Sequence, residues 1–150
     1  MRLRFRKATR SDVPAVVALL ADDVLGSHRE LGAIETYLAA FDTMSAEGNN
    51  HLIVGLDESD TVIATYQLTF ISGLSLSASR RAQVESVRVA TQFRGQGAGQ
   101  HMFADIEARA RSAGCKLIQL TMNKTRHDSA RFYTALGFTA SHVGFKKSLE

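Results

Sequence analysis

Residues 84–102, which read VESVRVATQFRGQGAGQHM, constrain the fold more than any other stretch of this chain. Their first part alternates apolar and polar side chains, as in a half-buried strand, and their last part opens a run with helical spacing. Between them, glycine occupies every second position at Gly95, Gly97 and Gly99. Glycine permits positive φ angles and close approach of a ligand, and a helix start presents backbone N–H groups to an anion. The stretch therefore predicts a strand, an anion-binding loop and a helix, with phosphate as the best-suited ligand.

Two common phosphate loops do not match these residues. A mononucleotide P-loop ends in Gly-Lys-Ser/Thr, whereas residues 95–100 read Gly-Gln-Gly-Ala-Gly-Gln. In the dinucleotide fingerprint the third glycine comes one residue later, and the loop stands early in its domain rather than in the second half of the chain. A glycine-rich turn without a ligand remains an alternative at this point.

Composition narrows the class of protein. A chain of 150 residues predicts one domain over residues 1–150, and no apolar run approaches the roughly 20 residues of a membrane span. The first six residues lack the apolar core of a signal peptide, and the single Cys115 excludes an internal disulfide. The net charge of +3 is too small to indicate nucleic acid by itself. We expect a cytoplasmic protein that binds neither membrane nor nucleic acid.

Periodicity and turn residues predict the element order β α α β β β α β α β. Thr9 with Asp12, or alternatively Ser11, caps the first helix. The expected strands are residues 2–6, 51–56, 62–71, 84–89, 117–122 (buried on both faces) and 139–146, and the expected helices are 13–24, 34–44, 99–113 and 130–136.

Two irregular features stand near the glycine loop. Val84 is out of phase with Val87, which predicts a β-bulge at Glu85-Ser86 that splays this strand from its neighbour. The Ser-rich segment from Ser72 to Arg81 is too long for a tight hairpin turn, so we expect it to shape a pocket or an interface.

Two motifs resemble those of the GNAT superfamily of N-acetyltransferases. Residues 94–99, RGQGAG, fit every fixed position of its acetyl-CoA loop, Arg/Gln-x-x-Gly-x-Gly/Ala. Residues 129–138, SARFYTALGF, are similar to its motif Ala-x-x-Phe/Leu-Tyr-x-x-x-Gly-Phe and follow about 35 residues later, as in the family. The resemblance implies the α/β (α+β) GNAT fold: a mixed, mostly antiparallel sheet, splayed between the fourth and fifth strands and flanked by helices. It also implies acetyl transfer from acetyl-CoA to a primary amine of a small molecule or peptide, by direct attack in a ternary complex.

The resemblance assigns residues to acetyl-CoA. Loop N–H groups would bind the pyrophosphate, and an unpaired N–H on the splayed strand would polarise the thioester carbonyl. Many members carry an asparagine seven residues before the tyrosine of the second motif, where this chain has Arg126; Asn123 lies three residues earlier, so either side chain is a candidate. The cofactor candidates are Val87, Arg88, Val89, Arg94, Gly95, Gln96, Gly97, Ala98, Gly99, Asn123, Arg126 and Tyr133.

Two residues are candidates for catalysis. Glu85 stands at the expected bulge, where the family often has a carboxylate that deprotonates the amine through water, and where burial would favour that role; the alternative is a structural carboxylate. Tyr133 would protonate the leaving thiolate, since a phenol with a pKa near 10 can donate to a thiolate; the alternative is a core tyrosine. An acetyl-cysteine route through Cys115 is disfavoured because a whole helix separates it from the loop. The five histidines show no metal-ligand spacing, so no metal is expected.

The identity of the acceptor amine is the property of the reaction that the sequence constrains least. Candidate walls are residues 25–33, 70–81 and the last strand, and Arg80, Arg81 and Arg88 would suit an acceptor bearing a carboxylate better than a polycation. Apolar edges left by the Ser-rich segment, the long strand before it and the last strand predict a homodimer. Two other functions stay open: a CoA-binding regulatory module without turnover, and a small basic nucleic-acid binder.

Overall fold

The computed structural model describes residues 2–22, 30 and 32–150. They fall into two compact units, one within residues 1–119 and one within residues 120–150. The single domain predicted over residues 1–150 stays a prediction.

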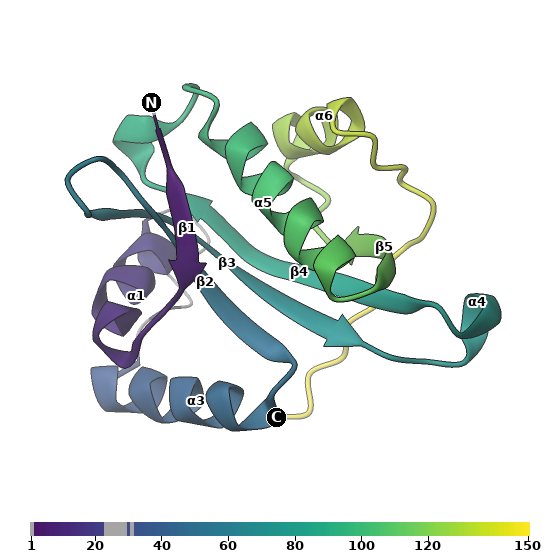
Figure 1. The fold of residues 1–150 in the computed structure, drawn as a ribbon, viewed down its shortest axis with the longest axis horizontal. Coiled ribbons are helices and arrows are strands. Elements are labelled where there is room, and N and C mark those ends of the chain that lie inside the picture. Colours follow the sequence, from purple (N-terminus) through teal and green to yellow (C-terminus); the bar gives the residue numbers. More distant parts are fainter. Residues whose placement is uncertain (1, 23–29, 31) are drawn as a thin grey trace. The chain divides into compact units, whose positions relative to one another are not determined.

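The first unit is built on a five-stranded sheet with the strands in chain order (Figure 1). Each of the first four strands pairs antiparallel with the next. Because helix α5 connects β4 to its neighbour β5, these two strands run parallel. The predicted mixed sheet, splayed between its fourth and fifth strands, is confirmed. The strands are β1 (Arg4–Lys7), β2 (Asn50–Leu56), β3 (Val62–Ile71), β4 (Arg80–Val89) and β5 (Cys115–Leu120).

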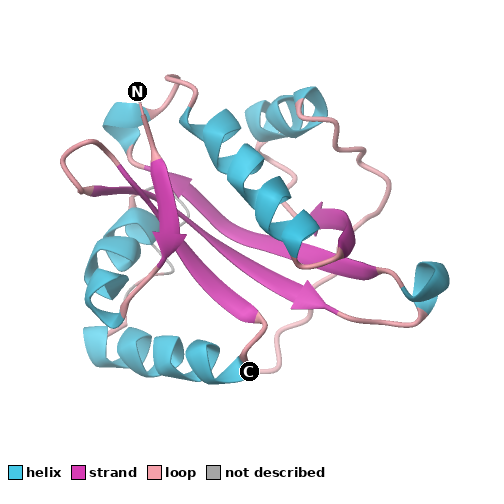
Figure 2. Ribbon diagram, viewed as in Figure 1, coloured by secondary structure: helices cyan, strands magenta, loops and turns pink. Residues whose placement is uncertain are grey.

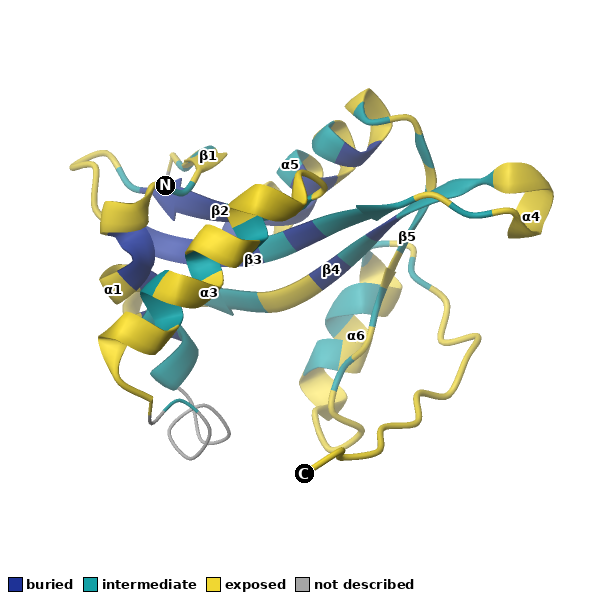
Figure 3. Ribbon diagram, turned by 90° about the horizontal axis from the view of Figure 1, so that it is seen from below, coloured by how far each residue is buried: buried dark blue, intermediate teal, exposed yellow. Residues whose placement is uncertain are grey.

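Helices cover both faces of the sheet (Figure 2). Helices α1 and α3 lie on one face and α5 on the other (Figure 3). The helices of this unit are η1 (Arg10–Asp12), α1 (Val13–Ala21), α3 (Ile34–Glu47), α4 (Ser75–Ala78), η2 (Thr91–Phe93) and α5 (Ala98–Ser112). The predicted extension of the first helix to Val24 lies outside the described residues.

The core follows the predicted periodicities. In β3, Ile63 and Ala64 are fully buried, and so are Tyr66 and Leu68, because helices cover this central strand on both faces. The buried stripe of α5 has the predicted spacing of about 3.6 residues and consists of Met102, Phe103, Ile106 and Ala110.

A polar network fixes α5 to the sheet. The Tyr66 hydroxyl donates to Asp105 Oδ2 at 2.5 Å, and Arg109 Nε donates to the same oxygen at 2.8 Å. Burial and the Asp105 carboxylate together raise the pKa of Tyr66. The buried hydroxyl and the carboxylate thus satisfy each other, and α5 is held in one position on the sheet.

Of the two predicted caps for the first helix, Thr9 with Asp12 is the one observed. The Thr9 N–H donates to Asp12 Oδ2 at 2.7 Å, which closes the capping box. The Arg6 guanidinium binds the same carboxylate at 2.6 and 3.1 Å and, with the N–H bond, holds the pKa of Asp12 below its usual value.

The second unit contains one helix, α6 (His127–Ala135), among its described residues. It ends in a Schellman motif: the Phe138 N–H donates to the Tyr133 carbonyl and the Gly137 N–H to the Thr134 carbonyl, both at 3.0 Å. Gly137 takes the required left-handed conformation, with φ = +94°. The predicted end of this helix is confirmed.

The predicted last strand over residues 139–146 is wrong. The structure has no strand there; a tight turn in which the Ser141 N–H donates to the Thr139 carbonyl interrupts the segment. The two large apolar side chains of the segment, Val143 and Phe145, are 80% and 93% exposed. Apolar side chains favour burial, whereas a strand also needs a neighbouring backbone to pair with.

Two further expectations need correction. Strand β5 was expected to be buried on both faces, but none of its residues is fully buried, because β5 is an edge strand of the sheet. The Ser-rich segment is shorter than expected, since β4 already begins at Arg80. It contains α4, whose residues Leu76, Ser77 and Ala78 all have positive φ.

Candidate active site

The glycine loop joins η2 to α5 and adopts the conformation that its glycines permit. Gly95 and Gly97 have φ angles of +76° and +82°, which L side chains rarely adopt. A Cβ atom added to either would meet no protein atom within 4 Å. The glycines are therefore required by the backbone conformation, and the space in front of the loop is not filled by protein.

The first turn of α5 is open to an anion. Its N-cap residue is Gly97, so no side chain caps the helix, and Gly99 is the second helical residue. The first N–H groups of a helix have no intrahelical acceptor and lie at the positive end of the helix dipole. The loop residues thus fit the pyrophosphate of a CoA thioester, which carries the negative charge that such a helix start prefers.

Arg94 has a structural role in this loop. Its Nε donates to the Val89 carbonyl at 3.0 Å and its Nη2 to the Asp22 carbonyl at 3.2 Å. These bonds tie the loop to the end of β4 and to the residue that follows α1. Arg94 is one of the predicted cofactor residues; its guanidinium is held by these two carbonyl groups, and its contact with acetyl-CoA stays a prediction.

The β-bulge predicted at Glu85-Ser86 is confirmed. Glu85 lies opposite Gln67 and Arg88 opposite Thr65, so two residues of β4 face the single residue between them on β3. Ser86 has a φ of +54°, in the left-handed region. The extra residue shifts the phase of β4 between Val84 and Val87, the two residues that are out of phase in the sequence.

Strand β5 accompanies only the first part of β4. The Gln119 side chain near the end of β5 donates to Gln83 Oε1 at 2.7 Å, before the bulge, and β5 ends at Leu120. Since the two strands run parallel, residues 87–89 lie beyond the end of β5. On their other edge Arg88 and Val89 pair with β3, opposite Thr65 and Ala64. The N–H group predicted to polarise a thioester at Val87, Arg88 or Val89 stays a prediction.

Glu85 is exposed rather than buried. Its cross-strand partner Gln67 is held in place, because Gln67 Nε2 donates to Asn50 Oδ1 at 2.8 Å. Gln67 and Asn50 were not predicted as site residues. The sequence shows that β3 carries polar residues, but which of them lie beside Glu85 depends on the strand register. The sequence predicted that burial would favour a role for Glu85 as a base, and this burial is not observed.

Three of the predicted residues belong to the second unit. Asn123 Oδ1 accepts hydrogen bonds from the backbone N–H and the hydroxyl of Thr125, at 3.0 and 2.7 Å. Arg126 is exposed and is the N-cap residue of α6. Tyr133 is half-buried, with its ring in edge contact with Phe132 and Phe138 at centroid distances of 5.4 and 5.8 Å. Their roles toward acetyl-CoA stay predictions.

Cys115 is the first residue of β5, separated from the glycine loop by the whole of α5. Burial raises the pKa of its thiol, which lowers the thiolate fraction. Both observations are consistent with the interpretation of Cys115 as a packing residue.

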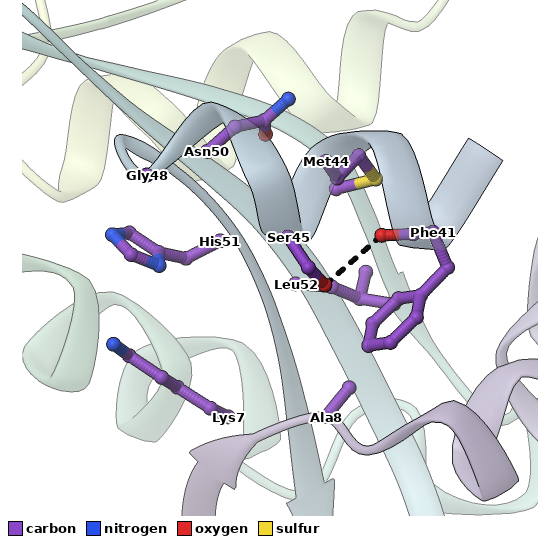
Figure 4. Close-up of a pocket in the computed structure, with 9 residues that line it drawn as sticks. All are labelled: Lys7, Ala8, Phe41, Met44, Ser45, Gly48, Asn50, His51 and Leu52. Atoms are coloured by element: carbon purple, nitrogen blue, oxygen red, sulfur yellow. Dashed lines mark hydrogen bonds between the residues drawn. The ribbon is translucent and has the colours of Figure 1, made fainter.

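A cavity of about 260 Å³ lies at the opposite end of the sheet from the glycine loop, and Figure 4 shows the residues that line it. It adjoins the start of β2, whose Asn50 is opposite Thr69, whereas the loop follows the end of β4. Burial and the charges of Lys7 and Arg109 lower the pKa of His51 at this cavity. Its lining residues are Lys7, Ala8, Phe41, Met44, Ser45, Gly48, Asn50, His51 and Leu52. None of them is a predicted catalytic or cofactor residue.

The described part of the chain lacks two kinds of feature. No group of three His, Cys, Asp or Glu residues within it is arranged to hold a metal ion. None of its helices combines the length and apolar character needed to cross a membrane.

Known proteins resemble this chain in sequence and in fold. An aminoalkylphosphonate N-acetyltransferase of Salmonella typhimurium is 37% identical over 67 residues, which is 45% of this chain and 44% of that protein. The match thus spans less than half the length of this curated relative. The crystal structure of a transcriptional regulator from Bacillus halodurans is 40% identical with a TM-score of 0.93, and the match covers 99% of this chain and 100% of that one. A predicted acetyltransferase with acetyl-CoA from Clostridium acetobutylicum shares the fold, with 18% identity and a TM-score of 0.76 over 99% of this chain and 97% of that one.

The family model described as the Acetyltransferase (GNAT) family matches residues 16–138. This range includes the bulged strand, the glycine loop and the Tyr133 helix. The chain therefore belongs to the GNAT family of acetyltransferases, as its two sequence motifs predicted.

Proposed function

We propose that this protein is an N-acetyltransferase that moves the acetyl group of acetyl-CoA to a primary amine of a small molecule or peptide. The observation that carries the proposal is the pairing of an uncapped, glycine-opened helix α5 with the bulged strand β4 that leads into it. Family membership supports acyl transfer, and residues 94–99, which resemble the family's acetyl-CoA loop, support acetyl-CoA as the donor. The single half-buried cysteine is consistent with action in the cytoplasm.

Different residues of this chain bind acetyl-CoA and transfer the protons of the reaction. The N–H groups at the start of α5 bind the pyrophosphate, and Arg94 holds their loop against β4. Acetyl-CoA supplies the acetyl group, and the acceptor amine attacks it directly in a ternary complex. Glu85 accepts the amine proton through water, and Tyr133 donates a proton to the leaving thiolate. Asn123 or Arg126 completes the contact with CoA.

A thiol-release screen tests the proposal. Purified protein with acetyl-CoA is offered a panel of primary amines, and free CoA is measured with a thiol reagent. The panel includes amino acids, aminoglycosides, polyamines, peptides and aminoalkylphosphonates, the last because of the name of the Salmonella relative. We expect amine-dependent release with at least one class. Release at the background hydrolysis rate across the whole panel, from protein that binds acetyl-CoA, contradicts the proposal.

A second candidate function is a CoA-binding regulatory module with weak or no turnover. One observation favours this second candidate: the similar structure from Bacillus halodurans is named a transcriptional regulator. The same screen separates the two, because a regulatory module binds acetyl-CoA in a calorimetric titration yet releases no thiol with any amine.

We also propose a homodimer. Leu74 and Leu76, at the tip that joins β3 to β4, are 92% and 69% exposed, and adjacent left-handed residues hold this tip in a strained turn. Light scattering at micromolar concentration is expected to give about twice the 16.4 kDa chain mass. The double variant Leu74→Glu and Leu76→Glu should return the mass to that of one chain. A wild-type mass near 16.4 kDa contradicts the dimer.

A further inference from the structure

We propose that Gln67 binds the acceptor amine: its side-chain oxygen accepts one N–H of the amine, while Glu85 receives the proton of the other N–H through water. This inference rests on the proposed N-acetyltransferase function and adds the residue that orients the amine and selects primary over secondary amines.

Gln67 is a polar residue on the central strand of the sheet. Its neighbours in β3, Tyr66 and Leu68, are fully buried. A polar side chain in such surroundings costs stability unless its polar atoms have partners. Gln67 is half-buried, and its Nε2 donates to Asn50 Oδ1 at 2.8 Å. The other polar atom of this amide, Oε1, is the one whose partner has to be found.

A chain of hydrogen bonds determines which atom of the Gln67 amide is left over. An ionised carboxylate can only accept, so Glu47 of α3, at 3.3 Å from the Asn50 amide, requires the NH2 group of Asn50. The oxygen of Asn50 is then the atom that contacts Gln67, and an oxygen acceptor requires the NH2 group of Gln67. The atom left over is therefore the oxygen, which is a hydrogen-bond acceptor.

This oxygen is accessible to a ligand. Within the described part of the chain, no hydrogen bond reaches Gln67 Oε1. Nor is Oε1 one of the buried side-chain atoms that lack a partner there, so it is open to solvent. Glu85 is exposed and likewise forms no ion pair or hydrogen bond with the described residues. Both acceptors are thus available at the surface of the sheet.

Strand register brings the two acceptors together. Gln67 and Glu85 are directly opposed in the antiparallel pair of β3 and β4, so their side chains share one face and start about 5 Å apart. They lie next to the β-bulge, since Ser86 follows Glu85 and has a φ of +54°. Two neighbouring acceptors fit a group that carries two donors on one atom, and a primary amine is such a group.

This arrangement orients a neutral primary amine for attack. With one N–H bonded to Gln67 Oε1 and the other bonded through water to Glu85, the nitrogen lone pair is directed away from both residues. The nitrogen forms a bond to the acetyl carbon, and the bond from that carbon to sulfur breaks. One amine proton passes through water to Glu85, and the thiolate takes up the proton that Tyr133 donates. The N–H held by Gln67 is the one that remains in the amide product.

Paired acceptors test the role of Gln67. The primary amine with the highest kcat/KM in the thiol-release screen is compared with its N-methyl derivative, as glycine is with sarcosine, in the wild type and in Gln67→Met. A neutral secondary amine has one N–H and cannot bond to both acceptors, so we expect the wild type to prefer the primary amine. Methionine keeps the length of the side chain without the amide, and Gln67→Met should lower kcat/KM for the primary amine about 10-fold, the scale of one hydrogen bond. The preference for the primary amine should fall with it.

Gln83→Met is the matched control. Gln83 is also a half-buried glutamine, two residues from Glu85 on β4, but it lies opposite Thr69 and is bonded to Gln119 of β5 at 2.7 Å. We expect this variant to keep the wild-type kcat/KM and the wild-type preference. A loss of preference in Gln83→Met instead of Gln67→Met overturns the assignment.

A double-mutant cycle tests whether Asn50 acts through Gln67. Asn50→Ala should lower kcat/KM for the primary amine about 3-fold, because the Gln67 amide is then less firmly held. In the Gln67→Met background the same substitution should have no further effect. Equal effects in both backgrounds contradict the positioning of Gln67 by Asn50. All of these variants should bind acetyl-CoA as the wild type does, since the glycine loop is unchanged.

A binding measurement separates this inference from the proposed function. The CoA-bound wild type and Gln67→Met are titrated calorimetrically with glycine, 2-aminoethylphosphonate, putrescine, kanamycin and trialanine. Amine affinity that Gln67→Met weakens, without thiol release by any amine, supports the amine site and contradicts the enzyme. Thiol release with the same kcat/KM and the same preference in the wild type and Gln67→Met overturns the role of Gln67 and leaves the enzyme in place. Absence of both thiol release and Gln67-dependent binding contradicts both proposals.

Discussion

Replacing Tyr133 by phenylalanine is expected to lower kcat about 100-fold, the usual scale for losing one general acid, with affinity for acetyl-CoA unchanged. Phenylalanine keeps the edge contacts of the ring with Phe132 and Phe138, and the Schellman motif that positions the residue uses only backbone groups. The variant therefore removes the hydroxyl and keeps these ring contacts and backbone hydrogen bonds. A fall in kcat with little change in KM shows that the hydroxyl acts mainly in the transition state.

Two controls accompany this variant. Phe132→Leu changes the neighbouring side chain on α6 and should affect kcat far less. Glu85→Gln should lower activity in a different manner, with partial recovery at high pH, because an acceptor amine that is already neutral needs no base. If Tyr133→Phe retains full kcat on the best acceptor while chemistry is rate-limiting, the proton comes from water or from the product and not from Tyr133.

Replacing Gly97 by aspartate is expected to weaken acetyl-CoA binding by roughly 100-fold, because a carboxylate at the start of α5 repels the pyrophosphate. A side chain at this position meets no protein atom within 4 Å, so it clashes with nothing inside the protein. The φ of +82° imposes strain of about 1 kcal/mol on any L residue, which is a small stability cost.

Gly97→Asn is the matched control, since asparagine has the same size and the same backbone strain but no charge. We expect both variants to unfold at similar temperatures in the absence of CoA, and Gly97→Asp to bind acetyl-CoA much more weakly than Gly97→Asn in a calorimetric titration. Unchanged affinity in a folded Gly97→Asp protein would falsify the assignment of the loop to the cofactor. Equal weakening in the two variants would assign the effect to the side chain's bulk and not to its charge.

The sequence alone determined the features that depend on neighbouring residues. The glycines at positions 95 and 97 predicted a loop with positive φ, and both have it. The phase slip between Val84 and Val87 predicted the bulge, which the register and the φ of Ser86 confirm. Helical spacing predicted the buried stripe of α5, and the two motifs predicted the GNAT family. Each of these signals lies within one element or one short stretch, where covalent geometry and periodicity act directly.

Only the tertiary structure decided what depends on partners far along the chain. Three arginines were equivalent in the sequence, but strand register placed Arg88 on the face of Glu85, while Arg80 bonds to the Ala113 carbonyl. Residues 139–146 were predicted as the last strand and form none, because a strand needs a neighbouring backbone to pair with. Glu85 was expected in a buried position and is exposed, since burial depends on which other elements cover a face. Strand register, strand pairing and the covering of a sheet face by helices are set by contacts between segments far apart in the chain. The sequence of one short segment therefore does not determine them.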